Sequence, residues 1–309
     1  MRSQIFGPVP SRRLGRSLGV DLVPFKTCTY DCIYCQLGPT TCKTIDRKEW
    51  VPLDAVVDQL KEHLPANPDY ITLSGSGEPT LYSRLAELID QIKTTTNVPV
   101  AVLTNGSLLW RDDVCRQLMD ADLVIPSLDA GDEAMFRLVN RPHAELAFEQ
   151  MLGGLIDFRG KFPGDCWLEV FVLAGSTALP EEFAKIAQCI RQIKPGRVQL
   201  NTVSRPPAEP SAIGVSRRDL DDLASALPLP AEVIADFRGV HQQTEFAAGR
   251  EQILQMLRRR PCSIADIADG LAMHRNEVIK YIEELSVAGL LEEVVTTAKH
   301  YYKVITDRD

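Results

Sequence analysis

Three closely spaced cysteines, Cys28, Cys32 and Cys35, are the side chains best suited to chemistry in this chain of 309 residues. Spacings of four and three residues let three thiols converge on one centre, and such thiolates usually hold iron–sulfur clusters or zinc. An all-cysteine zinc site normally has four ligands, and the next thiol, Cys42, lies seven residues beyond Cys35. On a cubane cluster, three cysteines would leave one iron open to a ligand that is not protein.

The elements that would position this loop alternate between residues 50 and 203. Short runs rich in Val, Ile and Leu alternate with amphipathic stretches, which is typical of repeated β-α units around a parallel sheet. The predicted strands are Ser17–Leu22, Tyr70–Ser74, Val98–Thr104, Leu123–Ser127, Trp167–Leu173 and Arg197–Val203. The predicted helices are Leu53–Leu64, Leu81–Ile92, Asp113–Met119, Ala144–Phe158 and Pro180–Ile193. A closed eight-unit barrel needs ~250 residues, so we predict an α/β fold with an open, partial (β/α)6 barrel of parallel strands.

Polar residues and glycines follow the first four predicted strands at their carboxyl ends, where parallel α/β folds place their chemistry. The cysteines follow the first strand, and the segments Ser74–Thr80, Thr104–Ser107 and Ser127–Asp129 follow the next three. We therefore expect these segments to form one site.

The glycine-rich segment after the second strand has three interpretations. A dinucleotide-binding loop is weakly indicated, because Thr80 stands where a third glycine belongs. In the second interpretation, the glycines let the backbone approach a ligand closely, and Glu78 or exposed carbonyls bind the polar groups of that ligand. A tight turn with Glu78 near a helix N-terminus is the third. The neighbouring cysteine loop favours the second.

The pattern Cys-x-x-x-Cys-x-aromatic-Cys, with Tyr34 as the aromatic residue, is followed on the next strand by Gly-Glu-Pro. Over residues 5–205 the chain resembles the radical S-adenosyl-L-methionine (SAM) superfamily. The phrases FGPVPSRRLG (6–15) and QLNTVSRPP (199–207) resemble a subgroup of largely uncharacterised radical SAM proteins related to wyosine-forming tRNA enzymes.

This resemblance implies that Cys28, Cys32 and Cys35 hold a 4Fe-4S cluster whose open iron binds SAM. An electron from a donor such as flavodoxin or ferredoxin would cleave SAM reductively, and the resulting 5′-deoxyadenosyl radical would abstract hydrogen from a substrate. The resemblance places Tyr34 near the adenine, Gly77 and Glu78 at the methionyl amino group, and Asn105, Ser127 and Asp129 at the ribose or carboxylate. The family usually has two adjacent glycines before the glutamate, and Ser76 replaces the first.

No general-acid pair or nucleophilic triad is visible in the sequence, which agrees with chemistry supplied by cofactors. No catalytic side chain is therefore assigned. His143, Asn201 and Arg205 are further candidates for contact with substrate or cofactor.

Composition indicates a globular cytoplasmic protein that does not bind membranes. Apolar residues make up 45% and charged residues 25% of the chain, and no apolar run approaches the ~18–20 residues of a membrane span. Prolines and arginines interrupt any signal-peptide core near the N-terminus. Eight cysteines without such a signal favour a reducing compartment.

The sequence divides into residues 1–205, the barrel, residues 206–248, a connector with helical pieces, and residues 249–309. In this last part we predict helices at Arg250–Arg259, Ser263–Gly270 and Asn276–Ala288, then a hairpin of Leu290–Val295 and Tyr301–Ile305. Three helices and a two-stranded ribbon are typical of a winged helix-turn-helix. Residues 250–309 carry nine basic against ten acidic side chains, which is weak for nucleic-acid binding. Protein docking, dimerisation and capping of the open end of the barrel are alternative roles for this part.

The substrate is not identified by sequence. Eight basic against four acidic side chains in residues 1–50 fit an RNA base, whereas the net charge of −8 fits a protein or a small metabolite. A radical SAM maturase acting on a protein partner is one alternative. A redox-sensing iron–sulfur DNA-binding regulator and a zinc-binding structural protein are the others.

Overall fold

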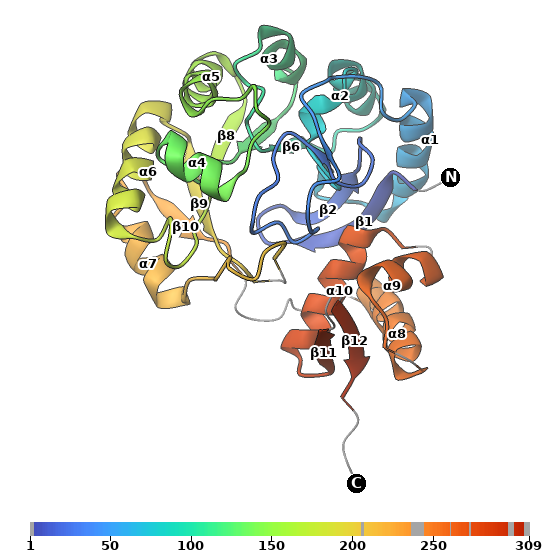
Figure 1. Cartoon of the computed structure of the whole chain (residues 1–309). Coiled ribbons are helices and arrows are strands. Elements are labelled where there is room, and N and C mark those ends of the chain that lie inside the picture. Colours follow the sequence, from blue (N-terminus) through green and yellow to red (C-terminus); the bar gives the residue numbers. More distant parts are fainter. Residues whose placement is uncertain are drawn as a thin grey trace.

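The computed structural model describes residues 3–204, 207–235, 244–259, 261–271, 273–295 and 300–305. Its central sheet contains, in spatial order, β1 (Ile5–Ser11), β2 (Gly15–Val20), β5 (Tyr70–Leu73), β6 (Val100–Thr104), β7 (Leu123–Pro126), β8 (Asp165–Phe171), β9 (Arg197–Asn201) and β10 (Ala231–Val233) (Figure 1). β1 pairs antiparallel with β2, and every other neighbouring pair is parallel. The protein is thus an α/β fold with a mostly parallel central sheet.

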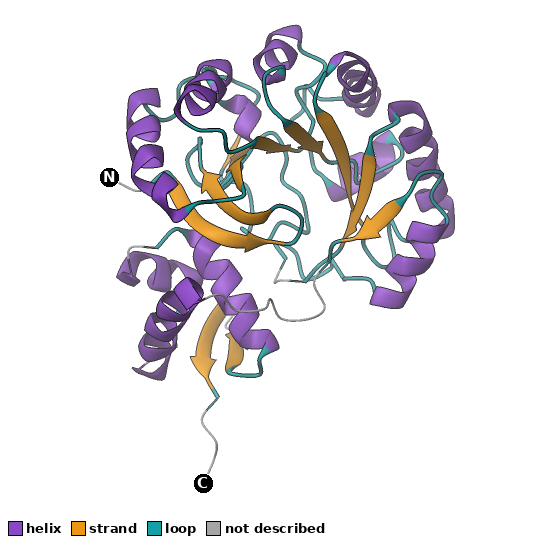
Figure 2. Cartoon of the chain, turned by 180° about the vertical axis from the view of Figure 1, so that it is seen from behind, coloured by secondary structure: helices purple, strands orange, loops and turns teal. Residues whose placement is uncertain are grey.

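Helices cover the outer side of this curved sheet. They are α1 (Leu53–His63), α2 (Leu85–Thr95), α3 (Asp112–Leu118), α4 (Glu133–Val139), α5 (Phe148–Lys161), α6 (Pro180–Ile193) and α7 (Arg217–Ser225), with 3-10 turns η1 (Leu64–Ala66) and η2 (Pro79–Leu81). Figures 1 and 2 show most of these helices on the convex side of the curved sheet, with the strands on the inner side. Each long helix buries one apolar stripe, such as Leu85, Leu88, Ile89 and Ile92 of α2.

The six predicted strands all form, with ends within two residues, and they follow one another across the sheet in chain order. α2 begins at Leu85, not at Leu81, because Pro79–Leu81 forms η2. The sequence did not predict α4, the short pair β3 (Thr27–Cys28) and β4 (Cys42–Lys43), or two strands of the central sheet. β1 was missed because it contains Pro8 and Pro10, which an edge strand tolerates. β10 was missed because it contains three residues within the stretch interpreted as a connector.

The chain after residue 243 forms a smaller C-terminal unit with its own apolar core. It contains α8 (Thr244–Arg259), α9 (Ile264–Leu271), α10 (Arg275–Val287) and the antiparallel pair β11 (Leu291–Val295) and β12 (His300–Val304). Its core includes Ile253, Leu257, Ile267, Val278 and Leu285. α10 lies against β1, at the edge of the main sheet (Figure 1).

Membrane-spanning helices are absent from the described part of the chain: none of its helices combines the length and the apolar character that crossing a bilayer requires.

Candidate functional site

The cysteine loop leaves the sheet after β2 and is held by short backbone pairing. β3 (Thr27–Cys28) pairs in parallel with β4 (Cys42–Lys43), which closes the loop around Cys32 and Cys35. The loop also lies against Gly77 so closely that a Cβ there would sit 1.8 Å from the Thr27 carbonyl oxygen. Gly77 is therefore required for contact between the two loops.

Each of the three candidate sulfur ligands accepts a hydrogen bond from a different nitrogen. Lys26 Nζ lies 3.1 Å from Cys35 Sγ, and Asn105 Nδ2 lies 3.5 Å from Cys28 Sγ. Asn140 Nδ2 lies 3.5 Å from Cys32 Sγ. Hydrogen bonds to the sulfurs are one means by which proteins tune an iron–sulfur centre.

The three cysteines are half-buried, and the surroundings of Cys28 and Cys32 suit a positively charged centre. Burial raises the pKa of Cys28 to about 12 and the pKa of Cys32 well above its usual value. The surrounding protein therefore does not favour the thiolate forms of Cys28 and Cys32. The positive charge of bound iron would have to stabilise their negative charge. The buried hydroxyl of Tyr30 has no hydrogen-bond partner among the described residues. These features fit a cluster on the three thiols, although no three His, Cys, Asp or Glu side chains in the described ranges are grouped tightly enough for a single ion.

Tyr34 and Asp129 join the cysteine loop to the ends of β7 and β8. The Tyr34 hydroxyl donates to Asp129 Oδ2, and its ring stacks on Phe171 with centroids 4.0 Å apart. Asp129 Oδ2 also accepts from Asn140 Nδ2 at 2.8 Å, while Oδ1 accepts from the Phe171 amide at 2.9 Å. Burial raises the pKa of Asp129 to about 6.

Glu78 is directed into the protein. Its carboxylate accepts hydrogen bonds from the Thr80 amide (3.0 Å), the Thr80 and Thr104 hydroxyls (2.6 and 2.5 Å) and the Asn105 amide (2.7 Å). Burial raises its pKa above the usual value even though these hydrogen bonds oppose the shift. Glu78 therefore shapes the loop by joining the ends of β5 and β6.

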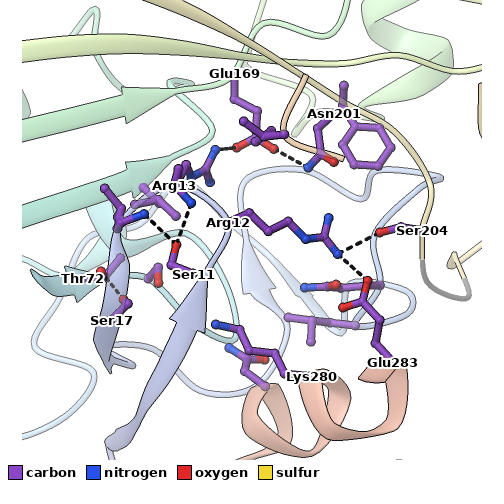
Figure 3. A pocket seen from close by; sticks show the side chains of 18 of the residues that line it. Ser11, Arg12, Arg13, Ser17, Thr72, Glu169, Asn201, Ser204, Lys280 and Glu283 are labelled. Atoms are coloured by element: carbon purple, nitrogen blue, oxygen red, sulfur yellow. Dashed lines mark hydrogen bonds and ion pairs between the residues drawn. The ribbon is translucent and has the colours of Figure 1, made fainter. Parts of the chain in front are cut away.

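A cavity of about 390 Å³ opens beside Tyr34 and Cys35. Its walls come from β1, the ends of several parallel strands, and α10 (Figure 3). Ser127 and Asn201 line it, as do four hydroxyl side chains: Ser11, Ser17, Thr72 and Ser74. The cavity thus connects the cysteine loop with the C-terminal unit.

Two ion pairs lie in the cavity wall (Figure 3). Arg13 pairs with Glu169 at 2.5 Å, and Asn201 Nδ2 donates to the same carboxylate at 2.9 Å. Burial alone would raise the pKa of Glu169, but Arg13 and these hydrogen bonds outweigh burial and hold the pKa below its usual value. Arg12 binds Glu283 of α10 and the Ser204 hydroxyl.

The structure brings the three cysteines, Tyr34, Gly77, Asn105 and Asp129 together, with Ser127 and Asn201 on the adjoining cavity wall. The His143 amide donates to the Thr29 carbonyl at 2.8 Å, and within the described ranges the ring accepts one long hydrogen bond, 3.4 Å from the Glu145 amide. His143 therefore supports the cysteine loop through its backbone. Arg205 lies outside the described residues.

With this geometry in view, comparison with known proteins decides the family. The family model described as the radical SAM superfamily matches residues 22–190, more than half of the chain. The chain belongs to the radical SAM superfamily.

The chain is also similar to curated proteins and to a solved structure. A UPF0026 protein of Helicobacter pylori strain 26695 is 32% identical over 93% of this radical SAM chain and 96% of its own length. A Brachyspira hyodysenteriae protein named GTPase Obg is 38% identical over 97% of this chain, which spans 45% of that protein. A radical SAM methyltransferase structure from Sphaerobacter thermophilus shares the fold, with a TM-score of 0.56 and 16% identity over 72% of this chain and 67% of that one.

Lys26 and Asn140 are site residues of this radical SAM protein that sequence reasoning missed. Lys26 adjoins the cysteine motif but carries no motif signal of its own. Asn140 lies 108 residues from Cys32 and follows α4, a helix that was not predicted. Proximity to Cys28 could have suggested Lys26, whereas no local pattern indicates Asn140.

Proposed function

We propose that the protein is a radical SAM enzyme in which Cys28, Cys32 and Cys35 hold a 4Fe-4S cluster and SAM binds at the open iron. The supporting observation is that each sulfur has its own N–H donor, on loops that meet beside a cavity. When bound, the two cofactors would supply one-electron cleavage of SAM and a 5′-deoxyadenosyl radical for hydrogen abstraction. A cytoplasmic flavodoxin or ferredoxin is the proposed class of electron donor.

The chain's own residues would bind and orient SAM. The Gly77 backbone would receive the methionyl group, and the lack of a side chain at Gly77 lets its loop pack on Thr27 of the cysteine loop. Tyr34 would lie beside the adenine, held by Phe171 and Asp129. Asn105 and Ser127 would bind the ribose or carboxylate. Glu78 would fix the loop from behind through its four hydrogen bonds, a role that differs from direct contact with SAM.

We propose a small metabolite as the substrate. A cavity of about 390 Å³ is within the range of roughly 300–1,000 Å³ that small-molecule sites occupy. Hydroxyls, Asn201 and the ion-paired arginines place polar groups in a wall that also contains apolar side chains such as Leu103 and Phe171. α10 of the C-terminal unit closes it on one side, which favours a small molecule over a folded RNA or a protein.

We further propose that the C-terminal unit is a winged helix that covers the barrel. α10 is the helix that would enter a DNA major groove, yet Asn276, Lys280 and Glu283 on it line the cavity. In this arrangement the unit acts as a wall of the site, which disfavours the DNA-binding regulator.

Release of 5′-deoxyadenosine tests the proposal. Protein purified and reconstituted without oxygen receives dithionite and SAM, with and without a small-molecule cell extract, and products are separated by chromatography. We expect product from wild type, none from Cys32→Ala, and wild-type product from the control Cys42→Ala, because Cys42 is exposed. An intact, reducible cluster with no product in either condition would contradict the proposed enzyme. Colourless protein that holds only zinc would contradict the cluster itself.

A further inference from the structure

The start of α10 contacts the residue before the cysteine loop and connects through Asp21 to the glycine-rich loop. The Arg275 guanidinium lies 4.2 Å from the centre of the Phe25 ring, directly before the cysteine loop. The His274 ring stacks on Phe6 of β1 with centroids 4.3 Å apart. The C-terminal unit therefore meets the barrel beside the site as well as across the cavity.

His274 connects to the glycine-rich loop through one carboxylate. His274 Nε2 lies 2.8 Å from Asp21 Oδ2. Asp21 in turn accepts from the Ser76 amide at 2.9 Å and from the Ser76 hydroxyl at 2.5 Å. Ser76 is the residue that departs from the two adjacent glycines usual in the family, and its hydroxyl provides one of these bonds.

The geometry fixes the direction of the first bond. His274 Nδ1 accepts from the Asn276 amide at 3.1 Å, at the N-terminus of α10. Nδ1 is therefore unprotonated, and Nε2 carries the proton that it donates to Asp21. The two side chains are 5% and 8% exposed, so water competes little for this bond.

The Ser76 loop is constrained from three further directions. The Ser76 carbonyl accepts from the Lys26 amide at 2.7 Å, and Gly77 packs on Thr27. A Cβ at Gly75 would lie 2.6 Å from the Asp21 carboxylate. Asp21 thus packs against the loop at Gly75 and Ser76, and a shift of Asp21 would move the loop.

We propose that His274 is a positioning residue for SAM: the docked C-terminal unit holds Asp21, and Asp21 holds the Ser76 loop in the conformation that binds SAM. This inference rests on the proposed function and adds regulation to the same site. A ligand or partner that displaces α10 lowers the affinity for SAM, because the Ser76 loop loses its support.

The test measures SAM binding by equilibrium dialysis on anaerobically reconstituted protein. We expect His274→Ala to weaken binding about tenfold, which is typical of coupling between two sites. His274→Gln, which keeps an N–H donor, should restore part of the loss. The matched control is His300→Ala, because His300 is exposed in the same unit and contacts Glu293. His300→Ala should bind SAM as wild type does.

A second readout requires no cofactor. Hydrogen exchange of residues 74–80 in cluster-free protein should increase in His274→Ala, while strands β6 and β7 keep their protection. An equal rise across the whole barrel would indicate a merely structural contact and overturn the inference. In an Asp21→Ala background, where the acceptor of the bond is removed, His274→Ala should add little further loss of SAM affinity.

The outcomes separate the two proposals. SAM binding by wild type with an unchanged dissociation constant in His274→Ala overturns the inference alone. Absence of SAM binding by reconstituted wild type overturns the proposed function, and the inference with it.

Discussion

Asn140 donates a 2.8 Å hydrogen bond to Asp129. The same side-chain nitrogen lies 3.5 Å from Cys32 Sγ, so one amide connects a buried carboxylate with a proposed cluster ligand. The amide can serve both because the backbone of the cysteine loop is tied to this region, with the Ile33 amide donating to the Val139 carbonyl at 3.0 Å. A substitution of Asp129 should therefore alter the hydrogen bond to Cys32 Sγ, and a change at Cys32 should alter the hydrogen bond to Asp129.

Asp129 should make stability depend on pH in a defined direction. Burial raises its pKa from 3.8 to about 6, so the folded protein binds this proton more tightly than the unfolded chain does. Relative to Asp129→Asn, wild type should gain unfolding free energy as pH falls from about 7 to about 4. The gain is at most about 3 kcal/mol, since each pKa unit corresponds to about 1.4 kcal/mol. Urea unfolding of both proteins across this range measures it, and a difference that stays constant with pH would refute the assignment.

Gly77→Ala should destabilise the protein by about 1–3 kcal/mol and reduce its iron content after reconstitution. The reason is that the new Cβ would lie 1.8 Å from the Thr27 carbonyl oxygen, so the two loops must separate. Gly153→Ala is the matched control, because Gly153 has open space around its Cβ position inside α5. That variant should be neutral or more stable by roughly 0.5–1 kcal/mol. Equal iron and equal stability in both variants would contradict the close contact.

Lys26→Met should lower the reduction potential of the proposed cluster. The variant keeps the length of the side chain but removes the cation 3.1 Å from Cys35 Sγ, and the more negative reduced state loses more stabilisation. A charged hydrogen bond of about 1.5–3 kcal/mol corresponds to a shift of at most about 65–130 mV for one electron. Redox titration followed by electron paramagnetic resonance measures this shift. Lys43→Met, whose amine contacts the Arg141 carbonyl, should keep the wild-type potential, and equal potentials in all three proteins would count against the role of Lys26.

Arg13→Met should destabilise the barrel by about 3 kcal/mol, because it leaves Glu169 in the cavity wall without its cation. The double variant Arg13→Met/Glu169→Met should be more stable than Arg13→Met alone, since it also removes the uncompensated carboxylate. Chemical unfolding of the four members of this cycle provides the comparison. Additive losses would show that the pair is not coupled.

The sequence carried enough information for the α/β class and the six strands, because hydrophobic runs and β-α alternation are local signals. The direction of Glu78 could not be predicted, since its burial depends on Thr104 and on the Asn105 amide, which belong to the end of the next strand. The role of Asn140 could not be predicted for the same reason, because it depends on a contact with Cys32, which lies 108 residues away in the sequence. The docked position of α10 was only one of several options, because the charge of the C-terminal unit does not specify a partner.

Ser76 has a consequence for the modularity of this protein. Its hydroxyl and amide bind an aspartate that a histidine from 253 residues away also binds. A shortened chain ending near residue 235 would keep every proposed cofactor ligand, yet it would expose Phe6 and leave Asp21 facing solvent on one side. Exchanging the C-terminal unit for that of a relative would succeed only if the new helix brought an equivalent donor. The two parts of the chain are therefore expected to be inherited and to vary together.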